Sequence, residues 1–89
     1  MEVNYEMRDK IFEIINNQMK ANDPPEVNET FKRLKKMGYT DFVTKQLIGQ
    51  CIAVEFYNIM TRREPFDEER YIMHLQNLPE EPFDDEEAD

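Results

Sequence analysis

Three residues of this sequence could together do chemistry. Cys51 and Glu55 lie one helical turn apart in the most apolar stretch of the chain, residues 47–60, and His74 is its single histidine. A thiol, an imidazole and a carboxylate are the groups of a small hydrolase with a cysteine nucleophile, and they are also metal ligands. A zinc site needs three or four ligands, and the sequence has neither a CxxC nor an HxxxH pair. We therefore predict no metal and no cofactor, and a hydrolase that uses Glu55 with Cys51 or His74 is kept as an alternative.

A structural role for Glu55 is the simpler interpretation. On a helical wheel Glu55 falls between Cys51 and Ile48, so its carboxylate points into an apolar stripe. A buried carboxylate without a partner is strongly destabilising or takes up a proton, so it needs a partner. The candidate partners are Arg62, Arg70, Tyr71 and His74. We expect an ion pair or hydrogen bond that holds the last helix against the third, and we expect Cys51 to be a core residue.

The elements that position these residues are four amphipathic segments. Apolar residues recur at helical spacing, and prolines or a glycine interrupt the pattern at NDPPE, at Gly38 and at Pro65. The third segment is apolar on nearly every side, which is typical of a helix packed on several faces. The pattern predicts an all-α bundle, with the third helix central and with helices at about 3–21, 24–37, 41–62 and 68–77.

Local signals at the helix starts support these boundaries. Asp23, Thr40 and Asp67 each stand where an N-cap side chain would accept a backbone hydrogen bond. Glu26 follows Asp23 by three residues, which predicts a reciprocal capping box at the start of the second helix.

The charge of the chain is concentrated at its end. The 89 residues carry a formal net charge of −9, and the last eleven, PEEPFDDEEAD, hold seven acids and no base, so residues 1–78 carry only −2. A block of like charges repels itself and usually does not fold. We therefore expect one helical domain at 1–78 and a disordered acidic tail at 79–89, in which Phe83 could anchor a partner.

A cluster of cations contrasts with this acidity. Four basic residues end the second predicted helix: Lys32, Arg33, Lys35 and Lys36. Cations at a helix C-terminus stabilise the helix through its dipole, and the cluster is also a candidate interaction surface. No aromatic residues alternate with it as they do in an RNA-stacking surface, and the overall charge is negative, so nucleic acid is not an expected partner.

The expected location is the cytoplasm. The N-terminal residues MEVNYEMRDK lack the pattern of a signal peptide, and no stretch approaches the roughly 20 apolar residues of a membrane span. The single cysteine cannot form an internal disulfide, which fits a reducing compartment. We expect no membrane association.

The order of these motifs resembles a family of small uncharacterised bacterial helical proteins. The likeness covers about residues 22–82 and consists of DPPE, a glycine, an E-hydrophobic-Y triplet, FDxxRY and LP, which correspond here to residues 23–26, Gly38, residues 55–57, residues 66–71 and residues 78–79. The resemblance implies a bacterial cytoplasmic protein. It implies no activity.

These observations favour a non-enzymatic module that works through protein contacts, as a homodimer or with another protein. The core is small, and the third helix has more apolar surface than three short neighbours easily cover, which self-association would bury. A second possibility is an acidic regulator whose tail mimics nucleic acid and occupies a nucleic-acid-binding protein. The hydrolase described above is the third.

Overall fold

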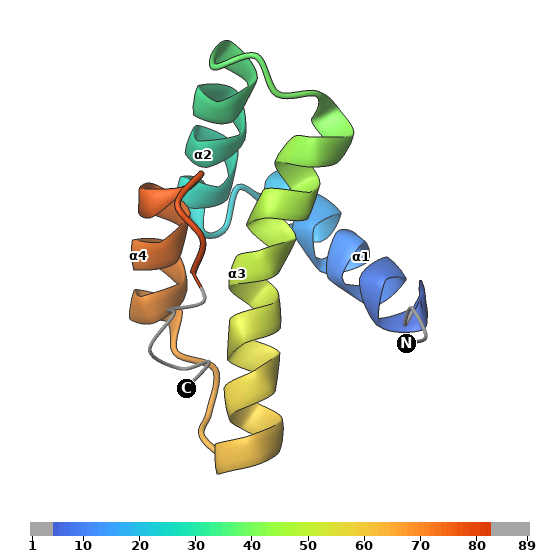
Figure 1. Cartoon of the computed structure of the whole chain (residues 1–89), viewed down its shortest axis with the longest axis vertical. Coiled ribbons are helices and arrows are strands. Elements are labelled where there is room, and N and C mark those ends of the chain that lie inside the picture. The colour runs from blue at the N-terminus through green and yellow to red at the C-terminus, as the bar shows by residue number, and fades with distance from the viewer. Residues whose placement is uncertain (1–4, 83–89) are drawn as a thin grey trace.

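The computed structural model describes residues 5–82 and, for Tyr5, the backbone alone. Within this range the chain is all-α and has no strand, which confirms the predicted fold class (Figure 1). Phe83 and the rest of the predicted tail after Pro82 lie outside the described residues. The helices are α1 (Tyr5–Ala21), α2 (Pro25–Lys36), α3 (Asp41–Arg62) and α4 (Glu68–Asn77).

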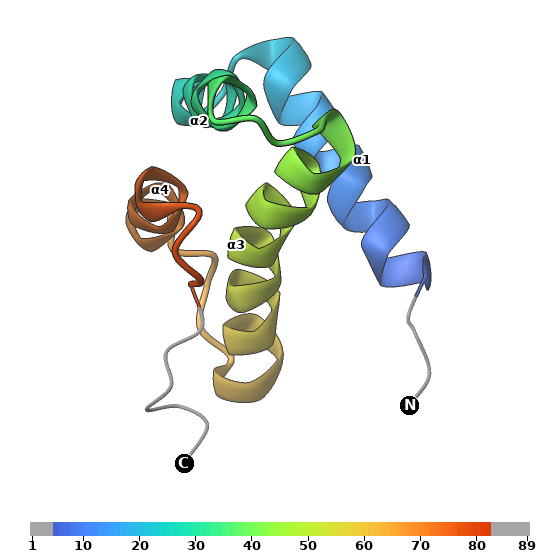
Figure 2. The same ribbon diagram turned by 45° about the horizontal axis from the view of Figure 1, so that its top comes forward.

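The third helix is the centre of the bundle, as its apolar pattern predicts. α3 packs against each of the other three helices, and α2 also packs against α1 and α4. Figure 2 shows α3 between α1 on one side and the pair α2 and α4 on the other. Three side chains of α3, Ile48, Cys51 and Ile52, are completely buried where these helices meet. Their burial removes apolar surface from water, which is the main force that holds the helices together.

Two of the predicted caps start their helices as expected. The hydroxyl of Thr40 accepts a hydrogen bond from the backbone nitrogen of Val43 at 3.2 Å. The carboxylate of Asp67 accepts one from the backbone nitrogen of Arg70 at 3.1 Å. Gly38 follows α2 with a φ of +105°, a conformation that a residue without Cβ adopts at little strain.

The predicted capping box at the second helix is wrong. α2 begins at Pro25, so the cap position falls on Pro24, which has no side-chain acceptor. The carbonyl of Pro24 accepts the first helical bond, from the nitrogen of Val27 at 3.1 Å. Asp23 instead follows the end of α1, and its backbone nitrogen donates to the carbonyl of Gln18 at 3.0 Å. The second proline therefore displaced the helix start by one residue and removed Asp23 from the cap.

A glycine sets the approach of α1 to α3. A Cβ atom placed on Gly49 would lie 3.0 Å from Cγ2 of Ile11 and 3.8 Å from Cδ1 of Ile15. Gly49 is buried, and both isoleucines belong to the core. The missing side chain therefore lets the two helices come into close contact at this point.

Candidate functional site

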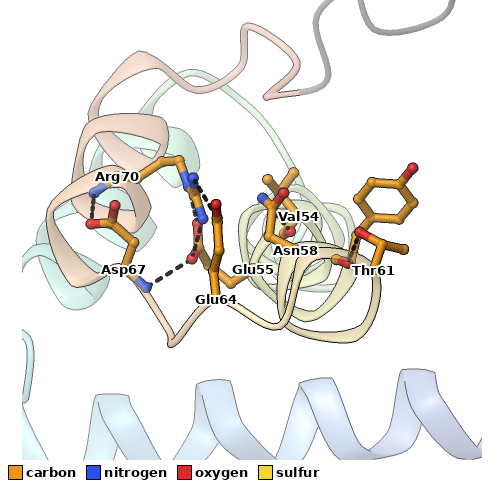
Figure 3. Close-up of polar contacts among 8 residues, drawn as sticks. Val54, Glu55, Asn58, Thr61, Glu64, Asp67 and Arg70 are labelled. Carbon is orange, nitrogen blue, oxygen red and sulfur yellow. Dashed lines mark hydrogen bonds and ion pairs between the residues drawn. The ribbon is translucent and has the colours of Figure 1, made fainter.

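The carboxylate of Glu55 is completely buried between α3 and α4. Its Oε2 accepts a hydrogen bond from Nε of Arg70 at 2.7 Å, and its Oε1 accepts one from Nη2 of the same residue at 3.0 Å. The backbone nitrogen of Asp67 donates to Oε1 at 2.9 Å. Figure 3 shows the two side chains pointing toward each other from neighbouring helices. Three donors, two of them from a cation, thus compensate the buried negative charge.

The start of α4 is built so that it completes this pair. Asp67 caps α4 with its side chain while its backbone nitrogen reaches Glu55, and Arg70 follows within the first turn. The guanidinium also lies 3.9 Å from the carboxylate of Glu64, in the loop before α4. The hydrogen bond with Glu55 raises the pKa of the Arg70 guanidinium, which stays charged. Of the candidate partners of Glu55, the structure places Arg70 against it.

The other candidate partners lie elsewhere. The hydroxyl of Tyr71 donates to Oε1 of Gln18 on α1 at 2.7 Å. Burial raises the pKa of this phenol well above its usual range. Nδ1 of His74 is buried and has no hydrogen-bond partner within residues 5–82. Arg62, at the end of α3, is exposed.

Cys51, Glu55 and His74 each have different polar surroundings in the structure. Sγ of Cys51 contacts the carbonyl of Leu47 at 3.8 Å, and burial raises the pKa of the thiol from 9.0 to about 12, so the nucleophilic thiolate is not formed at neutral pH. Among the described residues no hydrogen bond joins any two of the three. Within residues 5–82 no three His, Cys, Asp or Glu side chains lie close enough together to hold a metal ion. The arrangement fits a packed core with one ion pair.

The basic cluster of α2 is divided by its contacts. Nη1 of Arg33 donates to the carbonyl of Leu78 at 2.6 Å, and Nη2 donates to the carbonyl of Leu75 at 2.9 Å. Nζ of Lys35 lies 2.6 Å from Oδ1 of Asp41, which is the first residue of α3. The remaining pair, Lys32 and Lys36, is exposed. Arg33 and Lys35 therefore hold α2 against its neighbouring helices. This role depends on tertiary contacts, and no local pattern in the sequence predicts it.

An open groove lies between α1 and α3. It has a volume of about 420 Å³ and is mostly apolar, with polar groups from Arg8, Gln46 and Gln50. Oε1 of Gln50 is buried and has no hydrogen-bond partner among residues 5–82. The apolar lining consists of Met7, Ile11 and Phe12 from α1 and Val43, Leu47, Gly49 and Ala53 from α3. Because α3 is apolar on nearly every side, the sequence indicates that some apolar surface of this helix stays open. The sequence does not indicate on which side of α3 the groove lies.

The exposed side of α3 continues beyond the groove. Tyr57 is 59% exposed and Met60 is 70% exposed, and Phe42, at the other end of the helix, is 52% exposed. In Figures 1 and 2 the last turns of α3 extend past the N-terminal end of α1. Large apolar side chains that stay in contact with water beside an apolar groove are typical of a contact surface.

No protein-family model, no curated protein and no solved structure matches the chain significantly. The resemblance to a bacterial family therefore stays a prediction. Within residues 5–82, none of the helices combines the length and the apolar content that crossing a membrane requires.

Proposed function

We propose that this protein is a non-enzymatic helical module that acts through protein–protein contact at the α1–α3 groove. The observation that carries the proposal is the groove itself, which is open to solvent, mostly apolar and about 420 Å³ in volume. A groove between two helices receives an amphipathic helix by burying that helix's apolar face. The contact surface comprises the groove and the exposed side of α3 up to Met60.

The composition of the surface supports this role. Met7 and Met60 have unbranched, flexible side chains that adapt to the shape of a partner. Tyr57 has an apolar ring and a polar hydroxyl, a combination enriched at protein interfaces. Gln46 and Gln50 add polar groups that can fix the orientation of whatever binds.

The buried polar centre also favours a contact module over an enzyme. Glu55 is the best candidate for acid–base chemistry, and its oxygens are occupied by Arg70 and by the backbone of Asp67. A general base must reach the proton that it abstracts, and this carboxylate is completely enclosed. The hydrogen bonds of Glu55 hold α4 against α3, and they occupy both carboxylate oxygens that a substrate would need to reach.

A position-specific cross-linking experiment tests the proposal. A photoreactive amino acid is placed at Gln46, which is exposed and lines the groove, and in a second variant at Gln76, which is exposed on α4. Irradiation of the full chain in the producing cells should cross-link position 46 to one protein, either another copy or a different chain, and position 76 should give no such product. Ala53→Arg, which puts a charged side chain into the groove, should abolish the cross-link.

The control for this variant is Met73→Arg, because Met73 is exposed on α4 and lies outside the groove. Both variants should keep the thermal transition of the parent. Equal labelling from positions 46 and 76, or a product at position 46 that survives Ala53→Arg, would contradict the proposal.

A further inference from the structure

Each of the other three helices holds α4 through a polar side chain. Glu55 of α3 pairs with Arg70 in the first turn of α4. Gln18 of α1 accepts a hydrogen bond from the hydroxyl of Tyr71, and Arg33 of α2 caps the last carbonyls of α4. Because α1, α2 and α3 also pack against one another, they form a continuous surface, the α4 seat. A helix without the matching polar residues would leave these groups unpaired, so the seat is selective for the α4 sequence.

The loop that joins α4 to α3 is short and lies apart from the bundle. It comprises residues 63–67, and every residue from 59 to 69 is exposed, which is the longest such run within residues 5–82. Figure 1 shows the turn after α3 at the lower tip of the molecule, below α1, α2 and α4. Arg63 in this loop has a φ of +57°, a conformation that is strained for a residue with a Cβ atom. Short hinge loops under strain favour exchange of the element that follows them.

We infer that two copies of this chain exchange α4, so that the α4 of each copy occupies the α4 seat of the other about a two-fold axis near the hinge loops. The inference goes beyond the proposed function, because it does not involve the α1–α3 groove. The contacts between α4 and its seat are the same in the closed monomer and in the exchanged dimer. The hinge loop and the residues beside it therefore decide the balance between the two forms.

Two features of the hinge favour the exchanged dimer. Opening the loop releases Arg63 from its left-handed conformation. When extended, residues 63–67 span at most about 17 Å, so the α3 ends of the two copies must lie close together. Ile59 and Met60, which are 36% and 70% exposed in the single chain, are then covered by the partner subunit. Association costs translational and rotational freedom, so the dimer fraction should rise with protein concentration.

Mixing two variants of the full chain tests the exchange. In Arg70→Met the enclosed Glu55 loses its cation, and in Glu55→Leu the cation faces an apolar seat. If α4 is exchanged between them, Glu55 of one chain meets Arg70 of the other, and the two substituted apolar residues meet in the second seat. With different affinity tags, the mixture should yield a heterodimer of one chain each. Its thermal transition should lie above that of Arg70→Met alone.

The parent chain in place of Glu55→Leu is the control for this mixture. Exchange with the parent would only move the unpaired carboxylate to the other seat, so the thermal transition should not recover. Absence of a heterodimer from the mixture of the two variants overturns the exchange. Recovery is measurable even if Arg70→Met does not fold alone, because the partner chain then restores its helix content.

The length of the hinge provides a second test. Deleting Glu64 and Pro65 prevents α4 from reaching its own seat, and light scattering should then show the dimer as the main form. A flexible Gly/Ser segment inserted after Glu64 should instead give a monomer at the same concentration. The same insertion after Gly38, between α2 and α3, is the control and should leave the dimer fraction of the parent unchanged. A shortened chain that is monomeric with the helix content of the parent would contradict the exchange.

The chain with the lengthened hinge also separates this inference from the proposed function. In this chain α4 stays in its own seat, so photolabelling from Gln46 reports on the groove alone. A label at position 46 without α4 exchange in the mixed variants leaves the contact module standing and overturns the exchange. A heterodimer of the mixed variants without a label at position 46 supports the exchange and overturns the proposed function.

Discussion

The guanidinium of Arg33 on α2 donates to the backbone carbonyl of Leu78, just after α4, at 2.6 Å. Its other terminal nitrogen donates to the carbonyl of Leu75 at 2.9 Å. The last carbonyls of a helix have no partner within the helix, and α4 is followed by Pro79 in place of a glycine cap. A side chain distant in sequence therefore caps α4 and ties it to α2.

Replacement of Arg33 should destabilise the fold. We expect Arg33→Ala to lower the free energy of unfolding by about 2 kcal/mol, because charged hydrogen bonds to partly buried carbonyls are lost. Arg33→Lys should recover only part of the loss, since an ammonium group does not reproduce the planar fork of donors. Urea denaturation followed by circular dichroism measures the difference. Lys36→Ala, at an exposed position of the same helix, is the control, and an equal effect of both alanine variants would refute this role.

The ion pair between Glu55 and Arg70 should show strong coupling. Arg70→Met should cost about 3–5 kcal/mol, because it leaves the enclosed carboxylate with a single backbone donor. Glu55→Leu should cost less, since Arg70 is 27% exposed and can still reach water and Glu64. The double variant should be closer to the parent than Arg70→Met alone, because no buried charge remains. A double-mutant cycle measures the coupling, and additive effects would show that the pair does not act as a unit.

The close approach of α1 to α3 at Gly49 can be tested by a second double-mutant cycle, between Gly49 and Ile11. Alanine is the better helix former by about 1 kcal/mol, but in the parent its methyl group would meet Cγ2 of Ile11. Gly49→Ala should therefore be neutral or destabilising in the parent. In an Ile11→Ala background the contact atom is gone, so the same change should stabilise by about 1 kcal/mol. Thermal denaturation of the four proteins gives the comparison, and an identical effect in both backgrounds would exclude the steric explanation.

Alkaline pH should destabilise the protein. Burial raises the pKa of the Cys51 thiol from 9.0 to about 12 and that of the Tyr71 phenol above its ordinary 10.0. Between these ordinary values and the raised ones, the unfolded chain binds fewer protons than the folded chain, so the free energy of unfolding falls as pH rises above about 9. Denaturation measured at about pH 7, 9, 10 and 11 follows this loss of stability.

Two tyrosine variants test whether the Tyr71 phenol contributes to the loss of stability at alkaline pH. Tyr71→Phe should lower stability by about 1 kcal/mol at neutral pH through the lost hydrogen bond to Gln18, and it should flatten the fall above pH 10. Tyr57→Phe is the matched control, because Tyr57 is exposed and should change neither value. A pH profile of Tyr71→Phe that parallels the parent would show that this phenol does not contribute.

The helices and most of their boundaries could be predicted from local patterns. Periodic apolar residues and the hydrogen bonds of Thr40 and Asp67 act within one or two turns, so the sequence is enough to identify them. The same reasoning failed at Asp23, where two adjacent prolines moved the start of α2 and took the cap position. The place of α3 in the centre also followed, because its apolar residues occur on nearly all sides.

The partners of these residues were decided by the tertiary structure. The pattern of α3 indicates that Glu55 is buried, but only the docking of α4 selects Arg70 over Tyr71 and directs Tyr71 to Gln18. Arg33 belongs to a cationic run that looks uniform in the sequence, yet the packing of α2 on α4 makes it a cap. The groove likewise requires that α1 cross α3 at Gly49. Helix formation depends on near neighbours in the chain, whereas the choice of contacts depends on how the helices pack, which no local spacing records.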